Sequence, residues 1–184
     1  MTDRNRLAML LFIASEAVFF LLLIIAFVVY HEEAGNGAEV ASALDVPRTA
    51  VFTALLMASS ATVWLAVRSR RRRQAGSALG WIAATLALGT TFLVGQGREY
   101  IRLVQQDVTI SRDLFGTTFF TVTGFHGLHV LIGLVLLATL LVSGFVWRVE
   151  EPRTTLVENV SLYWHFVDAV WLCVFPVVYL WGRL

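Results

Sequence analysis

Long apolar runs separated by short polar connectors extend over the whole chain of 184 residues. Five of these runs have about the 20 residues that a helix needs to cross about 30 Å of hydrocarbon. They lie at about 7–30, 50–67, 79–103, 115–147 and 160–181. Because backbone groups in lipid must be hydrogen-bonded within their own segment, the runs are predicted to be helices rather than strands. The pattern predicts an all-α polytopic membrane protein, with residues 1–184 forming one membrane domain of five transmembrane helices.

The arginines are divided unevenly between the two sides that such helices define. Nine lie on the side of the N-terminus, namely Arg4, Arg6, Arg68, Arg70, Arg71, Arg72, Arg73, Arg148 and Arg153. Five lie on the other side, namely Arg48, Arg98, Arg102, Arg112 and Arg183. The connector at 31–46 contains Glu32, Glu33, Glu39 and Asp45 and no arginine. Because cytoplasmic connectors are enriched in basic residues, the N-terminus is predicted to lie inside and the C-terminus outside.

The arginine run at 70–73 is also compatible with a nucleic-acid partner. It directly follows a membrane span, however, where basic residues attract anionic lipid headgroups, so we expect lipid contacts and no nucleic acid. An apolar share of 58% is too high for an ordinary water-soluble domain. The single cysteine, Cys173, excludes an intrachain disulfide and a cysteine-based zinc site.

Glu16 interrupts the otherwise apolar first helix near the middle of the bilayer. An ionisable group at mid-bilayer costs about 2.5–3.5 kcal/mol on insertion scales, so its presence indicates a structural or functional role. None of its helical neighbours, which are phenylalanine and isoleucine, can balance a charge, and apolar surroundings favour the neutral carboxylic acid. Glu16 is therefore predicted either to handle protons or to serve as a structural hydrogen-bond donor.

Glu99 lies near the end of the third helix and precedes Arg102 by three positions. Residues three apart are neighbours on a helix surface, so the pattern predicts a local ion pair.

His126 and His129 lie three residues apart in TGFHGLHVLIG, and Gly133 continues the same face. Two histidines on a membrane helix are compatible with haem or metal ligation. Axial haem ligands must approach opposite faces of the porphyrin, normally from separate helices, which favours interhelical hydrogen bonding instead. Gly133 is predicted to let a neighbouring helix approach closely.

Polar residues on the last helix recur every three or four positions, and this stripe consists of Glu158, Ser161, His165, Asp168 and, at its apolar end, Leu172. Such a stripe is predicted to face protein rather than lipid. His165 and Asp168 are expected to satisfy each other across one turn, and Pro176 is expected to kink the helix. Neither a catalytic set nor the discontinuous helix pair of secondary transporters is recognisable, so no catalytic, metal-binding or haem-binding residue is predicted.

At these same residues the chain resembles subunit III of cytochrome c oxidase and related haem–copper oxidases. The segment LFIASEAVFF around Glu16 is similar to the family's first core helix. The segment GQGREYIRL is similar to its Gln–x–x–Glu–Tyr segment and places Gln96, Glu99 and Tyr100. The longest similar stretches are DLFGTTFFTVTGFHGLHVLIG and ENVSLYWHFVDAVWLCVFPVVYLWG.

The resemblance implies a non-catalytic subunit of a proton-pumping oxidase of aerobic respiration, located in a bacterial inner membrane. It implies packing beside oxidase subunit I, contacts with subunit II and other subunits, support of proton uptake, and phospholipid as a candidate ligand. Haem and copper are expected in the partner subunits and not in this chain. The family's carbodiimide-reactive glutamate corresponds to Glu16. The other membrane polar residues are expected to be structural, namely Gln96, Glu99, Arg102, His126, His129, Glu158, His165 and Asp168.

Mitochondrial-type members have seven helices, so the resemblance implies that the two-helix arm walling their lipid cleft is absent here. Within the family, the alternatives are subunit III of a quinol oxidase and a nitric oxide reductase-associated relative. The alternative from a different class is a membrane cytochrome that ligates haem through His126, His129 and His165. A secondary transporter is a third alternative.

Overall fold

The computed structural model describes residues 2–33, 44–110, 114–146 and 154–181. These residues form α1 (Thr2–Glu33), α3 (Val46–Arg71), α4 (Ala75–Gln105), α5 (Leu114–Val146) and α6 (Thr154–Phe175), followed by the short π-helix η1 (Pro176–Leu180). Five helices are long and apolar enough to cross a membrane, and the described residues contain no strand. The predicted all-α membrane fold is therefore confirmed.

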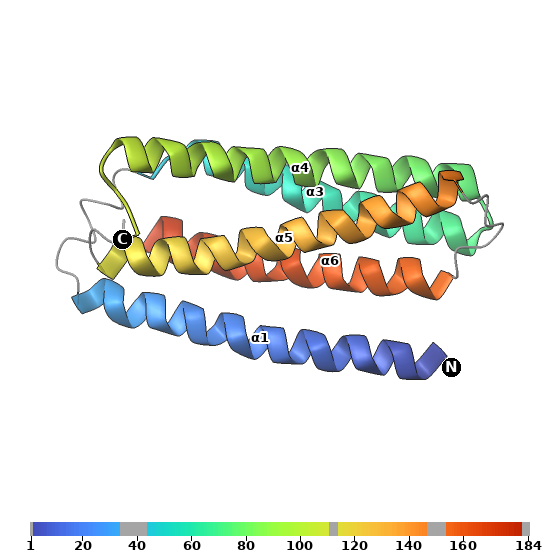
Figure 1. Cartoon of the computed structure of the whole chain (residues 1–184), viewed down its shortest axis with the longest axis horizontal. Coiled ribbons are helices and arrows are strands. Elements are labelled where there is room, and N and C mark those ends of the chain that lie inside the picture. The colour runs from blue at the N-terminus through green and yellow to red at the C-terminus, as the bar shows by residue number, and fades with distance from the viewer. Residues whose placement is uncertain (1, 34–43, 111–113, 147–153, 182–184) are drawn as a thin grey trace.

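The helices run side by side as a bundle (Figure 1). α3 and α4 form a closely packed hairpin, while α5 and α6 lie between this hairpin and α1. α1 begins at the end of the bundle where α3 turns into α4, which we call the N-terminal end, and η1 lies at the opposite or far end. This arrangement brings residues that are distant in sequence to the same depth in the bundle.

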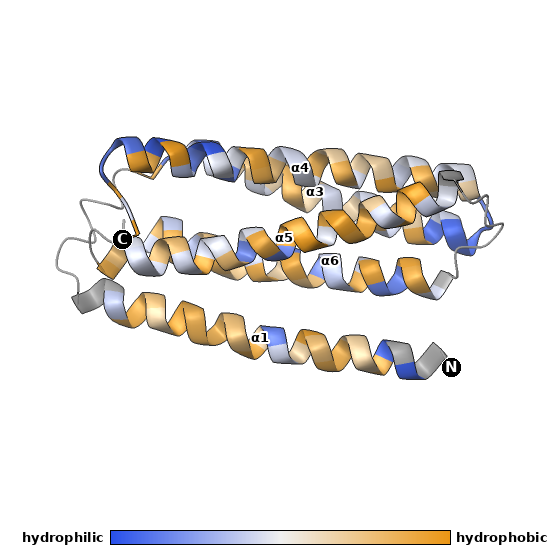
Figure 2. Cartoon of the chain, viewed as in Figure 1, coloured by the Kyte–Doolittle hydropathy of each residue, from blue (hydrophilic) through white to orange (hydrophobic). Residues whose placement is uncertain are grey.

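Polar residues are concentrated at the two ends of the bundle, with a few bands within the apolar helices (Figure 2). Most helices extend beyond the predicted apolar runs, because capping groups and charged residues continue them past the hydrocarbon. At the start of α3, Asp45 Oδ1 accepts a hydrogen bond from Arg48 N at 3.1 Å, and Pro47 occupies the first turn. α3 ends at Arg71, and Arg73 then takes a left-handed backbone conformation with φ of 59°.

Close helix packing depends on Trp164, a fully buried side chain of α6. A Cβ atom at Gly89 of α4 would lie 2.6 Å from its ring, and one at Gly133 of α5 would lie 2.8 Å from it. The indole Nε1 donates to Ser59 Oγ of α3 at 2.9 Å. Gly133 therefore permits the close approach predicted from the sequence, and one indole joins four helices.

Pro176 ends the α-helical hydrogen bonding of α6. The backbone N–H of Trp181 bonds to the carbonyl oxygen of Pro176, five residues earlier, as in a π-helix. The proline thus replaces the last part of the predicted helix with a wider turn. Several residues used above to predict orientation lie outside the described residues, namely Glu39, Arg112, Arg148, Arg153 and Arg183, as does Trp147 at the end of the fourth predicted run.

Candidate functional site

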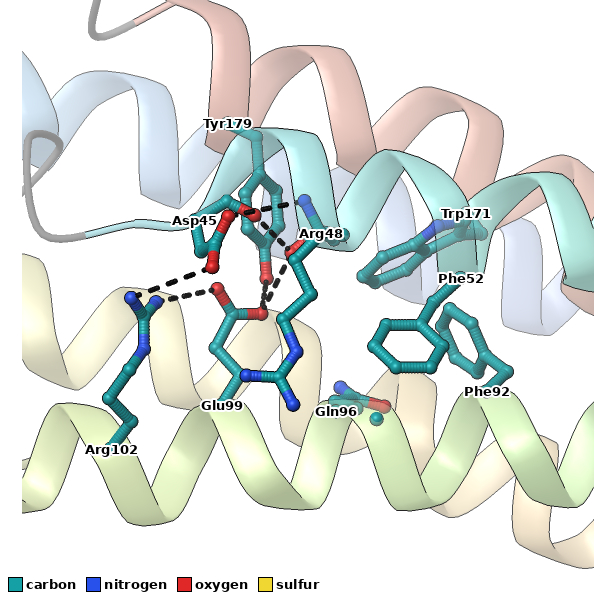
Figure 3. Close-up of a pocket in the computed structure, with 11 residues that line it drawn as sticks. Asp45, Arg48, Phe52, Phe92, Gln96, Glu99, Arg102, Trp171 and Tyr179 are labelled. Carbon is teal, nitrogen blue, oxygen red and sulfur yellow. Dashed lines mark hydrogen bonds and ion pairs between the residues drawn. The ribbon is translucent and has the colours of Figure 1, made fainter.

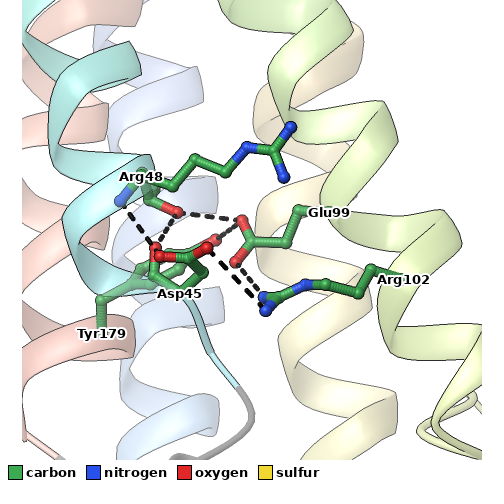
Figure 4. A network of polar contacts seen from close by, with 6 residues as sticks. Asp45, Arg48, Glu99, Arg102 and Tyr179 are labelled. Atoms are coloured by element: carbon green, nitrogen blue, oxygen red, sulfur yellow. Dashed lines mark hydrogen bonds and ion pairs between the residues drawn. The ribbon is translucent and has the colours of Figure 1, made fainter.

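Glu99 on α4 is a buried carboxylate near the far end of the bundle (Figure 4). Its Oε2 accepts a hydrogen bond from Tyr179 Oη at 2.8 Å and lies 3.1 Å from Thr49 Oγ1. Arg102 Nη2 donates to Glu99 Oε1 at 3.5 Å, so the predicted local contact is present. Asp45 Oδ2 lies 3.9 Å from Arg102 Nη1. One carboxylate therefore joins the start of α3, the end of α4 and η1.

A small cavity lies beside this cluster (Figure 3). Its walls include the rings of Phe52, Phe92 and Trp171 and the side chains of Arg48 and Gln96. Its volume of about 10 Å³ leaves room for one water molecule at most, so the space is too small for an organic cofactor.

Gln96 connects the same part of α4 to α5. Its Nε2 donates to the carbonyl oxygen of Thr123 at 2.8 Å and lies 3.3 Å from Tyr100 Oη. Tyr100 Oη lies 2.7 Å from Thr123 Oγ1. Gln96 and Tyr100 of α4 are thus both hydrogen-bonded to Thr123 of α5. The Gln96 Oε1 atom is buried and has no hydrogen-bond partner among the described residues.

Glu16 belongs to α1 and contacts α5, where its Oε2 is 3.1 Å from His129 Nε2. His129 Nδ1 lies 2.8 Å from the carbonyl oxygen of Phe125. Because a carbonyl oxygen only accepts, Nδ1 carries the hydrogen. Nε2 then either accepts from a protonated Glu16 or, in an imidazolium, donates to its carboxylate. The prediction from the sequence took into account only the neighbours of Glu16 on its own helix, whereas its partner, His129, lies on α5.

His126 differs from its neighbour in having no polar contact. Its side chain is fully buried, and neither ring nitrogen has a hydrogen-bond partner among the described residues. The imidazole stacks on Trp171 with ring centroids 4.7 Å apart, and Phe92 and Phe20 lie further around it. The prediction of an interhelical hydrogen bond is thus met by His129 and wrong for His126, because aromatic rings surround the latter. These rings leave no exposed face for a porphyrin.

His165 and Asp168 of α6 meet at Ser60 of α3 rather than at each other. Ser60 Oγ donates to Asp168 Oδ2 at 2.5 Å and lies 2.8 Å from His165 Nδ1. A hydroxyl has a single hydrogen, so Ser60 accepts from His165 while it donates to Asp168. The predicted direct contact is replaced because α3 supplies a hydroxyl between the two side chains. The other oxygen, Asp168 Oδ1, is buried without a partner among the described residues.

The ends of the predicted stripe on α6 are less buried than its centre. Glu158 accepts a hydrogen bond from Arg71 Nε at 2.9 Å, in an exposed ion pair at the N-terminal end. Leu172 is 52% exposed, so this chain covers only about half of its side chain, and facing protein stays a prediction at this end of the stripe.

Sequence reasoning missed Ser60, Thr49 and Tyr179, each of which bonds to an acidic side chain on another helix. Hydroxyl residues are common in membrane helices and often bond to their own backbone, as Thr53 does to the carbonyl oxygen of Thr49. Only the packing of the helices distinguishes the two uses. Among the described residues, no group of three or more histidine, cysteine, aspartate or glutamate side chains is placed to hold a metal ion.

The family described as cytochrome c oxidase subunit III matches residues 1–183 of this chain. The chain belongs to the cytochrome c oxidase subunit III family. Among its relatives, the cytochrome bo(3) ubiquinol oxidase subunit 3 of Pseudomonas aeruginosa is 33% identical, over 95% of this chain and 83% of that protein. The cytochrome c oxidase subunit 3 of Corynebacterium diphtheriae is 36% identical, over 92% of this chain and 84% of that protein.

A vertebrate relative, the cytochrome c oxidase subunit 3 of Danio rerio, is 37% identical over 96% of this chain and 69% of that protein. Subunit III relatives of both electron-donor types thus match nearly the whole chain. The relatives and the five spans identify this chain as a haem–copper oxidase subunit III and a multi-pass membrane protein of a multi-subunit complex.

Proposed function

We propose that this subunit III is non-catalytic and that it packs beside subunit I, where it stabilises the oxidase and supports proton uptake. The observation that carries the proposal is the family match over residues 1–183. In this proposal oxygen is reduced to water by haem and copper in the partner subunits. The protein is then a subunit of an aerobic respiratory chain in a bacterial inner membrane.

The use of the buried polar groups supports a structural role. Glu99 joins α3, α4 and η1, and Ser60 joins His165 and Asp168 across α3 and α6. Glu16 and His129 connect α1 to α5. Each of these groups bonds within the chain, as expected when membrane polar groups hold helices together.

Glu16 is the residue that we propose reacts with carbodiimide. Its side chain is 23% exposed, so its carboxyl is not fully enclosed by this chain and a reagent dissolved in the apolar phase can reach it. Its contact with His129 Nε2 gives its proton an acceptor within the chain. We infer that this pair adjusts protonation near the partner subunit and takes no part in oxygen chemistry.

Orientation follows from the charges at the two ends of the bundle. We propose that the N-terminal end, where Arg68, Arg71, Arg72 and Arg73 cluster, faces the cytoplasm, with phospholipid headgroups against these arginines. Glu99 and Arg102 then lie on the outer side. Attaching a bulky impermeant maleimide to a cysteine introduced at Gln74 tests this, because the proposal predicts labelling in inside-out vesicles and none in right-side-out ones.

A specific observation also keeps the quinol oxidase assignment as a second candidate. The Pseudomonas relative is named as a ubiquinol oxidase subunit, whereas the Corynebacterium relative is named as a cytochrome c oxidase subunit, and the two have similar identity to this chain. Because the proposal places the electron-donor site on other subunits, both candidates predict the same role for this chain.

The test is purification of the complex through an affinity tag on this chain. The proposal predicts that haem, copper, oxidase activity and the polypeptides of subunits I and II are recovered together. It also predicts that the complex lacking this chain starts at a normal rate but loses activity faster during turnover. Recovery of the tagged chain without haem-containing polypeptides would contradict the proposal.

A further inference from the structure

A polar crevice enters the bundle from its N-terminal end, between α1, α3 and α6. Seven of its ten lining side chains are polar or charged, namely Arg6, Arg71, Thr155, Glu158, Asn159, Ser161 and His165, and the other three are Trp64, Val67 and Leu162. The crevice has a volume of about 280 Å³. One water molecule needs about 10–15 Å³, so there is room for several.

The crevice extends from the end of the bundle to His165. Thr155 lies at the start of α6 and His165 follows it by ten residues, which is about 15 Å along a helix and about half the thickness of the hydrocarbon. His165 is half-buried, and its Nδ1 is engaged with Ser60 Oγ at 2.8 Å. Its Nε2 is neither buried nor hydrogen-bonded among the described residues. This nitrogen is therefore available to water in the crevice.

A continuous hydrogen-bonded chain leads from His165 to a buried carboxyl group. Ser60 Oγ accepts from His165 Nδ1 and donates to Asp168 Oδ2 at 2.5 Å. Asp168 is only 3% exposed, and its Oδ1 has no hydrogen-bond partner among the described residues. Burying a carboxylate that is not fully hydrogen-bonded is costly, and gaining a proton removes its charge. The chain thus connects a group that is stabilised by a proton with water that can supply one.

We propose that Asp168 is a proton-holding site that exchanges its proton with water at the N-terminal end through Ser60 and His165, a set that we call the Asp168 relay. The inference rests on the function proposed above, and it gives the support of proton uptake a location within this chain. Chains of acidic, histidine and hydroxyl side chains are a recognised use of ionisable groups within membranes.

The transfer consists of three proton steps. A hydronium ion in the crevice gives a proton to His165 Nε2 and becomes water. Nδ1 of the same ring gives its hydrogen to Ser60 Oγ, and Ser60 gives its own hydrogen to Asp168 Oδ2. One proton has then moved from the crevice to the carboxylate, both rings and hydroxyl are neutral again, and no electron is transferred. Release reverses each step.

The surroundings make Asp168 the end of the relay. The ionisable groups of the helices packed around it are Arg6, exposed on α1, the ion pair of Arg71 and Glu158, the pair of Glu16 and His129, and His126, which stacks on Trp171. None of these has a hydrogen bond to the relay among the described residues. The site therefore stores a proton and returns it to the same side, rather than passing it across the membrane.

Infrared spectroscopy of the complex, purified through a tag on this chain, tests the proton-holding site. A protonated carboxyl group has a C=O stretching band, and the band that is absent from Asp168→Asn belongs to Asp168. In the unmodified complex this band should grow as the pH is lowered. If Asp168→Asn does not assemble, Ser60→Ala identifies the band, because losing a hydrogen bond shifts its frequency. Absence of the band at every pH at which the complex is stable would overturn the inference.

Transfer from ordinary to heavy water tests the relay, because exchange of the proton shifts the same band. Ser60→Ala should slow the exchange by about tenfold, as expected for a barrier raised by one lost hydrogen bond. Ser60→Thr keeps the hydroxyl and should exchange at the normal rate. Ser59→Ala is the matched control, because Ser59 holds Trp164 and has no hydrogen bond to the relay. Normal exchange in Ser60→Ala, or equal slowing in Ser59→Ala, would contradict the relay.

Blocking the crevice tests the entrance. In a Cys173→Ser background, a bulky methanethiosulfonate label on Asn159→Cys should slow the exchange as Ser60→Ala does. The same label on Gly80→Cys, near the same end of α4 but outside the crevice, should not. Equal exchange rates with the two labels would show that the crevice is not the entrance. If the unmodified chain recovers haem while any of the contrary results is found, only the relay fails. If it recovers no haem, the proposed function fails as well.

Discussion

Adding one methyl group beside Trp164 should destabilise the bundle, although alanine is normally the better helix residue. The substitutions are Gly89→Ala on α4 and Gly133→Ala on α5. Their Cβ atoms would lie 2.6 Å and 2.8 Å from the indole ring, whereas carbon atoms in contact are normally about 3.5–4.0 Å apart. The ring cannot easily move away, because it is fully buried and its Nε1 is bonded to Ser59.

The expected magnitude combines two opposing effects. Overpacking a well-packed core costs about 1–3 kcal/mol. Replacing glycine by alanine within a helix returns up to about 1 kcal/mol. We therefore expect each substitution at Gly89 or Gly133 to lower the free energy of unfolding by up to about 2 kcal/mol. Gly80→Ala, where the new methyl group meets nothing within 4 Å, should instead raise it by up to about 1 kcal/mol.

Circular dichroism during unfolding with sodium dodecyl sulfate, in mixed micelles, measures these differences for the three variants side by side. The order predicted for stability is Gly80→Ala, then the unmodified chain, then the other two variants. If Gly89→Ala and Gly133→Ala were as stable as Gly80→Ala, the indole would not be confined between the helices and the packing described here would be wrong.

Three further predictions concern the polar groups. Glu16→Gln should leave the complex assembled but abolish carbodiimide labelling of this subunit, and persistent labelling would place the reactive carboxyl elsewhere. Tyr179→Phe removes a hydrogen bond to a buried carboxylate and should lower the free energy of unfolding by about 1–3 kcal/mol, whereas Tyr30→Phe on the exposed surface of α1 should have little effect. Asp168→Leu should reduce recovery of this chain with the haem-containing subunits, measured as haem per tagged chain. Recovery equal to that of the exposed control Ala169→Leu would show that Asp168 does not support association.

The helices were predictable because the signal for a membrane span lies in local composition. Each apolar run is long enough to cross the bilayer, and the helix positions follow from these runs with few changes. The exact ends of the helices were not predictable, since they depend on caps such as Asp45 and on the left-handed turn at Arg73. The effect of Pro176 was foreseen as a bend, but a π-helical turn was not.

The polar contacts show where local sequence stops being informative. The contact of Glu99 with Arg102 spans three residues on one helix and was predictable. Tyr179, which bonds to the same carboxylate, is 80 residues away, and its position depends on how η1 packs. Ser60 lies 108 residues before Asp168. Pairing across helices is decided by their relative rotation and depth, which composition does not encode.

The central claim is that the histidines and carboxylates of this chain hold helices together beside a reaction centre located in other subunits. Its most direct test is the iron and copper content per polypeptide, measured for the whole complex and then for this subunit after separation in mild detergent. We predict haem iron and copper in the complex and none retained by the separated subunit with its helices intact. Stoichiometric iron porphyrin or copper on the separated subunit would contradict the account.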